Sequence, residues 1–306
     1  MKKIVVDSSC DISDIRLVYD ENNELVQFAK AALTIRVGEK EYTDNADLNI
    51  REMMDAMEAY DGASVTSCPS PAAWQDCFEG ADEIFVITLT STLSGAYNSA
   101  VLARKLELEE HPEKKIYVMD SLSTGPEMAL LVQQILYQIQ KGYDFDTICK
   151  NVEEYRGHTN LVFVLHSIDN LVKNGRVSKL AGFAANVLGI SVVGRASEHG
   201  ELEMISKGRG GNKTNMAVLQ EMKARGYQGG NVLITHCFSE KDAGKLRDCI
   251  WKEFPHAQIS ISKTGGLCSF YAETGGLLIG YETADKKFAL ANVLSHLEEE
   301  KVPSEA

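Results

Sequence analysis

The sequence predicts an α/β protein built from two α/β domains. Strand and helix patterns alternate regularly in its first half and less regularly in its second, and a polar stretch separates the two halves. Strand, polar loop and helix in succession are typical of parallel βαβ units. We therefore expect a mostly parallel sheet in the first half, with helices on both faces. Its strands are expected at 4–6, 84–89 and 116–119, with helices from Ser94 past Leu106 and from Glu127 to Leu136.

The second half predicts a mixed sheet with helices. A strand at 161–165 precedes two short helical segments, at 169–174 and 178–188, and a hairpin turns at 198–200 between strands 191–193 and 202–205. Helices are then expected at 214–225, 240–253 and 288–299, and strands at 232–235, 258–263 and 277–281. The polar stretch 151–158 places the division after Gly157, which gives domains 1–157 and 158–306.

Composition excludes several function classes. The chain has 306 residues, 44% hydrophobic and 25% charged, and a net charge of −13, which disfavours binding to nucleic acid or to an anionic membrane. The N-terminal apolar run is too short for a signal peptide, and no run of about eighteen apolar residues predicts insertion into a membrane. Seven scattered cysteines without a CxxC pair predict free thiols and no metal site. We expect a cytoplasmic protein.

Hydroxyl-bearing loops are the candidate ligand contacts. Parallel strands carry their ligands beyond their carboxyl ends, and three expected strand ends carry serine or threonine: Ser8-Ser9, 90–94 and 121–124. The loop from Thr90 to Gly95 leads into a helix N-terminus, which attracts anions, although Ser94 is equally explained as an ordinary N-cap.

The segment Thr66-Ser67-Cys68-Pro69-Ser70-Pro71 predicts a helix start with Ser70 as N-cap, and leaves Thr66 and Ser67 free to face a ligand.

Catalytic and cofactor motifs are absent from the sequence. Gly208 to Thr214 fails the phosphate-loop pattern, because Asn212 stands where a glycine is needed, and there is no GxSxG elbow. We therefore predict no cofactor. Basic residues near Arg176 and Arg209 indicate either a docking surface or a solvated helix face.

Six segments together resemble the DegV family, which includes the binding subunits of bacterial fatty acid kinase. They are Val5-Val6-Asp7-Ser8-Ser9-Cys10-Asp11, Tyr42-Thr43-Asp44, Thr66-Ser67-Cys68-Pro69-Ser70-Pro71, Leu93-Ser94-Gly95-Ala96-Tyr97-Asn98-Ser99-Ala100, Asp120-Ser121 and Gly175-Arg176-Val177-Ser178. The resemblance implies a fatty acid held between two α/β domains, without catalysis by this chain. It also implies a carboxylate bound by Thr66, Ser94 and the Gly95 N–H, and a fatty acid kinase as partner that docks near Arg176 and Arg209.

Glu273 departs from the family pattern. The segment Glu273-Thr274-Gly275-Gly276-Leu277 stands where ligand-binding members carry His-Thr-Gly-Pro-Gly. Two carboxylates in one buried site repel each other, so Glu273 either shares a proton with the ligand acid, points away, or serves another headgroup. We take the shared proton as the hypothesis.

Two other functions stay open at this point: an acyl- or phosphoryl-transfer enzyme that uses the Ser94 loop, and a regulatory module that senses a lipid.

Overall fold

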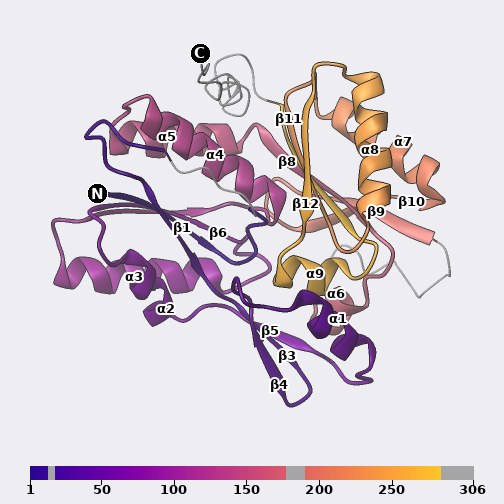
Figure 1. Ribbon diagram of the computed structural model, residues 1–306, viewed down its shortest axis with the longest axis horizontal. Coiled ribbons are helices and arrows are strands. Elements are labelled where there is room, and N and C mark those ends of the chain that lie inside the picture. Colours follow the sequence, from indigo (N-terminus) through magenta and orange to yellow (C-terminus); the bar gives the residue numbers. More distant parts are fainter. Residues whose placement is uncertain (13–17, 177–189, 284–306) are drawn as a thin grey trace, which may run out of the picture.

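The computed structural model describes residues 1–12, 18–176 and 190–283. Two large sheets lie next to each other, and a small three-stranded sheet lies at the bottom of the view in Figure 1. The predicted α/β class is confirmed. The helices expected at 178–188 and 288–299 fall outside the described residues.

The first large sheet is parallel throughout. Its order is β2 (Gln27–Ala31), β1 (Lys2–Asp7), β6 (Glu83–Thr88) and β7 (Lys115–Asp120). Successive side chains of a strand point to opposite faces. Helices cover both of these faces, as the alternating patterns predicted.

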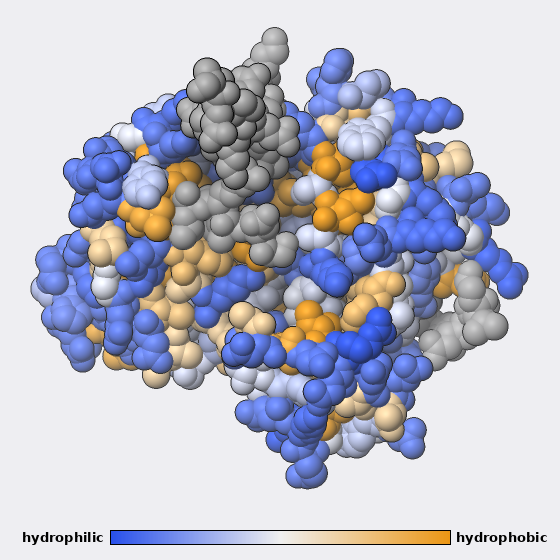
Figure 2. Space-filling view, viewed as in Figure 1, coloured by the Kyte–Doolittle hydropathy of each residue, from blue (hydrophilic) through white to orange (hydrophobic). Residues whose placement is uncertain are grey.

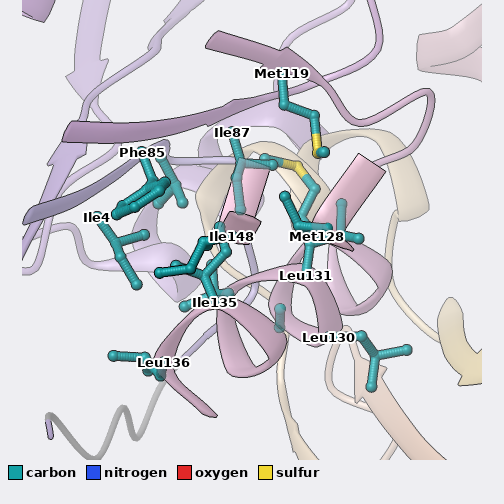
Figure 3. Packing of buried hydrophobic residues seen from close by; sticks show 14 of the residues in the cluster. Ile4, Phe85, Ile87, Met119, Met128, Leu130, Leu131, Ile135, Leu136 and Ile148 are labelled. Atoms are coloured by element: carbon teal, nitrogen blue, oxygen red, sulfur yellow. The ribbon is translucent and has the colours of Figure 1, made fainter. Parts of the chain in front are cut away.

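Two helix pairs make the two cores of this sheet. Ile4 and Val6 pack under α4 (Pro126–Gln140) and α5 (Phe145–Arg156), and Figure 3 shows Ile4, Phe85 and Ile87 meeting the apolar side of α4. On the other face, Val5 packs against α2 (Pro71–Phe78) and α3 (Ala96–Glu110).

The second large sheet is mixed, as predicted. Its order is β10 (Leu202–Arg209), β9 (Ile190–Ala196), β8 (Thr159–Leu165), β13 (Leu277–Glu282), β11 (Asn231–His236) and β12 (Gln258–Lys263). β11 and β12 run parallel, and the other neighbouring pairs are antiparallel. One face packs on α7 (Gly211–Ala224) and α8 (Glu240–Glu253), through residues such as Val162 and Val164.

The small sheet was not predicted. It consists of β3 (Thr34–Val37), β4 (Lys40–Thr43) and β5 (Val65–Ser67), and α1 (Ile50–Glu58) accompanies it. These elements share one core with α6 (Asp169–Lys173), α9 (Gly266–Ala272) and the second face of the six-stranded sheet (Figure 1). Part of the first half of the chain is therefore packed with the second half.

α4 lies between the two large sheets. Gly280 on β13 permits the contact, because a Cβ there would lie 2.6 Å from the backbone nitrogen of Glu127. The helix start and the loop before it are thus held against the six-stranded sheet. The six-stranded sheet begins with β8 at Thr159, so the division after Gly157 remains a prediction that agrees with the sheets but not with the packing of the small sheet.

No helix within the described ranges is both long and apolar enough to cross a membrane. Hydrophilic residues cover most of the face shown in Figure 2, and hydrophobic residues appear there in smaller groups.

Candidate ligand-binding site

A cavity of about 340 Å³ lies between the loops of the parallel sheet and the face of the mixed sheet opposite α7 and α8. Its volume falls within the range of small-molecule sites in proteins. Most of its lining is apolar: Leu33, Leu89, Leu93, Leu161, Phe163, Leu165, Leu171, Leu202, Leu267, Ala272 and Leu278. Hydroxyls and one guanidinium group supply the polar lining. This combination fits a ligand with a long apolar body and one polar end.

The apolar wall comes from alternate residues of β8. Leu161, Phe163 and Leu165 all point to the cavity face, and Leu278 lies opposite Phe163 on β13. The ring of Phe163 lies over Gly194 of β9, where a Cβ would be 2.3 Å from two of its ring carbons. Gly194 is therefore needed for the ring to lie against the sheet and leave the cavity open.

Thr66 is placed in the cavity wall by β5, the strand that precedes α2. Its Oγ1 lies 2.9 Å from the hydroxyl of Tyr271 on α9, and Ser67 and Cys68 line the cavity next to it. Ser70 accepts a hydrogen bond from the N–H of Ala73 at 3.2 Å, so the predicted helix start is confirmed.

Ser94 and Gly95 bring the N-terminus of α3 to the same cavity. The expected N-cap is shifted by one residue: Gly95 occupies that position, and Ser94 Oγ accepts from the Ala96 N–H at 3.2 Å. In the part of the chain that the structure describes, the Gly95 N–H has no acceptor. A free N–H at the positive end of a 15-residue helix is a favourable position for an anion.

Arg176 lies nearer to the ligand than we expected. It was predicted at a docking surface, but its side chain lines the cavity and donates to the carbonyl of Asn174 at 2.8 Å. Its remaining N–H groups can still bind an acid. Arg209 ends β10, is exposed, and is not among the residues that line the cavity. The two arginines are therefore not brought together at one ligand.

Buried carboxylates hold α9 in place behind the cavity. Asp44 accepts from the N–H groups of Gly266 and Leu267, both at 2.9 Å, and Asp11 accepts from Thr235 Oγ1 at 2.8 Å and from the Gly265 N–H at 2.7 Å. Burial raises the pKa of Asp11 to about 6. These contacts fix Leu267 and Tyr271, which lie on the cavity.

The three hydroxyl-bearing strand ends have different roles. The loop 90–94 and the loop 121–124 each supply lining residues, Ser94 and Thr124 among them. Ser8 and Ser9 are buried behind the cavity, where Ser8 Oγ accepts from the Leu33 N–H at 3.0 Å.

Glu273 is not brought to the cavity wall. It follows α9 with a φ of 54°, and its Oε1 accepts from the N–H of Asn170 at 3.1 Å, in the first turn of α6. Burial raises the pKa of Glu273. The geometry corresponds to the alternative in which Glu273 points away, and it gives no support to a proton shared with the ligand.

Sequence reasoning missed α9 and with it Tyr271 and Cys268. The pair Gly265-Gly266 opens this helix, but its seven residues carry too little periodic pattern to predict it from the sequence. Over the described ranges, no group of three His, Cys, Asp or Glu side chains could hold a metal ion.

Comparison with known proteins identifies relatives over nearly the whole chain. A family model described as "Uncharacterised protein, DegV family" matches residues 1–283. A DegV domain-containing protein of Streptococcus gordonii is 47% identical over 281 residues, which cover 92% of this chain and 98% of the relative.

Two similar crystal structures contain fatty acids. The Fatty Acid Kinase (Fak) B3 protein of Streptococcus pneumoniae, loaded with linoleic acid, is 44% identical with a TM-score of 0.88, covering 93% of this chain and 100% of that one. A DegV family protein of Eubacterium eligens, loaded with heptadecanoic acid, is 41% identical with a TM-score of 0.87 and the same coverage.

Proposed function

Because the chain belongs to the DegV family, we propose that it binds one long-chain fatty acid, non-covalently, in the cavity between its two large sheets. The observation that carries the proposal is the cavity itself, apolar along β8 and polar at Thr66, Ser94 and Gly95. The fatty acids in the two similar crystal structures support it.

The carboxylate lies at the polar end of the cavity in this proposal. Thr66 and Ser94 donate hydroxyl hydrogens, the Gly95 N–H donates along the axis of α3, and Ser67 lies beside them. Arg176 adds a positive charge that the resemblance alone did not assign to the ligand. Hydrogen bonds to a charged group are about twice as strong as neutral ones, so these donors fix the position of the headgroup.

The apolar wall supplies most of the affinity. Burying one methylene group contributes about 0.8 kcal/mol, so a chain of ordinary length gains more from the leucines than from the headgroup donors. The ordering of the chain subtracts from that gain.

We further propose that the chain presents its ligand to a kinase and performs no chemistry itself. Within the residues that the structure describes, the cavity lining contains no histidine, aspartate or glutamate that could act as a base toward Ser94. Arg209 remains the proposed docking residue, since it is exposed and lies outside the cavity. All seven cysteines are free thiols, which supports a cytoplasmic location.

Native mass spectrometry of the purified protein, followed by denaturing extraction, tests the proposal. We expect one fatty acid per chain, recovered unchanged. After lipid removal, Thr66→Val and Ser94→Ala should each weaken fatty acid binding by about tenfold or more, because each removes a charge-assisted hydrogen bond of roughly 1.5–3 kcal/mol.

Ser91→Ala is the matched control for that experiment. Ser91 belongs to the same loop as Ser94 but does not line the cavity, so its loss should leave affinity unchanged. A protein that binds no fatty acid after delipidation, or one that consumes it, would contradict the proposal.

A further inference from the structure

A second cavity, of about 370 Å³, lies beyond one end of the first. In contrast to the first, its lining is mainly polar, and includes Ser121, Glu127, Glu153, Arg156, Thr159, Ser197 and Arg225. Among the described residues, Leu161 is the one that lines both cavities. Leu161 therefore lies at the boundary between an apolar space and a polar one.

Three segments of the chain pass from one cavity to the other. On β8, Thr159 and Leu161 point to the same face, and Thr159 belongs to the polar cavity. The loop after β7 contributes Ser121 to the polar cavity and Thr124 to the apolar one.

The hairpin of β9 and β10 is the third segment, because Ala196 of the polar cavity lies directly opposite Leu202 of the apolar cavity. Three independent segments therefore place the two cavities against each other.

The polar cavity lies toward the end of β8 that is remote from Arg176. α6 and Arg176 follow the C-terminal end of β8, next to Leu165, whereas Leu161 lies four residues earlier. At about 3.3 Å per strand residue, these two leucines are roughly 13 Å apart along β8. A chain anchored near Arg176 and lying along β8 thus has its far end at Leu161.

Glu127 and Thr159 are the polar groups beyond this boundary. The two residues are 5% and 7% exposed, and Thr159 Oγ1 donates to Glu127 Oε1 at 2.7 Å, while the Ser123 hydroxyl donates to the other oxygen. A carboxyl group can accept about four hydrogen bonds, so both oxygens keep acceptor capacity. Burial raises the pKa of Glu127 to about 7, so near neutral pH this group is present both as donor and as acceptor.

The charges of the polar cavity are already balanced. Arg156 pairs with Glu153, and Arg225 pairs with Glu221 and Glu198. A second carboxylate would therefore meet acidic groups, and the described residues that line this cavity offer no unpaired cation to offset it. A hydroxyl, which both donates and accepts and carries no charge, fits these partners better.

We propose that the polar cavity receives the far end of the ligand, and that the protein selects acyl chains with a hydroxyl group at or near the end remote from the carboxylate. The proposal rests on the fatty acid site proposed above. A hydroxyl in a wholly apolar cavity loses its hydrogen bonds to water without replacement. In this proposal, a change of rotamer at Leu161 lets the hydroxyl group of the ligand reach Thr159 and Glu127.

Paired ligands test this selectivity directly. Calorimetric titration of the delipidated wild-type protein should compare hexadecanoic with ω-hydroxyhexadecanoic acid, and octadecanoic with ω-hydroxyoctadecanoic acid. We expect the hydroxy acid to bind more tightly than its parent at one chain length or both. Equal or weaker binding of the hydroxy acid at both lengths overturns the inference. Failure to bind either parent acid is a different result, which overturns the proposed function instead.

Two pairs of variants locate the effect. Thr159→Val should lower the affinity ratio of hydroxy acid to parent acid by roughly five- to tenfold, whereas Thr124→Val, the same change in the apolar cavity, should leave that ratio as in the wild type.

Leu161→Ala should raise the ratio because it joins the cavities, and Leu33→Ala, which removes the same volume elsewhere in the wall, should not. If Leu161→Ala does not fold, the comparison of Thr159→Val with Thr124→Val tests the site. Equal ratios in Thr159→Val and Thr124→Val contradict the site.

Discussion

The parallel sheet and the mixed sheet contribute to one cavity in different ways. The parallel sheet offers loops at the carboxyl ends of its strands, and these bring hydroxyls and a helix N-terminus, as at Ser94 and Gly95. The mixed sheet offers a strand face, on which Leu161, Phe163 and Leu165 form a continuous apolar surface. In the proposed function, the headgroup and the chain of the ligand are therefore recognised by separate parts of the fold.

Buried carboxyl groups such as Glu127 lie near the loops of the parallel sheet. Of the predicted effects on stability, that of Glu127→Gln should be the largest. Burial raises the pKa of Glu127 from its ordinary 4.5 to about 7, so between these values the folded protein holds a proton that the unfolded chain has lost. Stability contributed by this group is therefore lost as pH rises through that window. Relative to the variant, the wild type should lose about 3 kcal/mol of unfolding free energy as the pH rises through this window.

Urea denaturation at about pH 4.5 and about pH 7.5 measures this difference. Glu58→Gln, at an exposed position on α1, is the control and should follow the wild type at both values. An equal change in wild type and Glu127→Gln would show that Glu127 ionises normally in the folded protein.

The strand side is tested by one substitution at two glycines. Gly194→Ala places a methyl group 2.3 Å from the ring of Phe163 and 2.6 Å from the carbonyl oxygen of Glu203, which should cost about 1–3 kcal/mol of stability and lower acyl affinity as the ring moves into the cavity. Gly244→Ala on α8 meets no atom within 4 Å, and should stabilise the protein by about 0.5–1 kcal/mol.

Thermal or urea unfolding of the two variants measures whether each substitution raises or lowers stability, and titration with a fatty acid measures the change in affinity. Stabilisation by both substitutions would mean that Phe163 can leave Gly194 without loss, and the strand face would then not be fixed by this contact.

The smallest effect is expected at Glu273, which lies behind the headgroup end. Glu273→Gln keeps an acceptor for the Asn170 N–H, so it should change stability by about 1 kcal/mol or less and acyl affinity hardly at all. Titrations between mildly acid and mildly alkaline pH should give parallel curves for variant and wild type. A pH dependence of affinity that disappears in the variant would restore the hypothesis of a shared proton.

Sequence reasoning succeeded where the signal was local. Alternating strands and helices gave the parallel sheet, and the segments at Thr66 and Ser94 line the cavity as expected. Long-range packing decides features that the sequence does not reveal: Arg176 lines the cavity beyond α6, which packs on α9, and Glu273 accepts a hydrogen bond from Asn170 outside the cavity wall. Tyr271 was missed because a seven-residue helix carries too little periodic pattern to be recognised.

The small sheet has a consequence for the order in which the protein assembles. Ile35 and Met53 are made early during synthesis, but they pack with Phe163, Leu171 and Phe270, which the ribosome delivers more than a hundred residues later. The first half of the chain therefore cannot complete its packing alone, and a fragment that stops at residue 157 would leave this apolar surface uncovered. Such a fragment is expected to aggregate, even though its parallel sheet is intact.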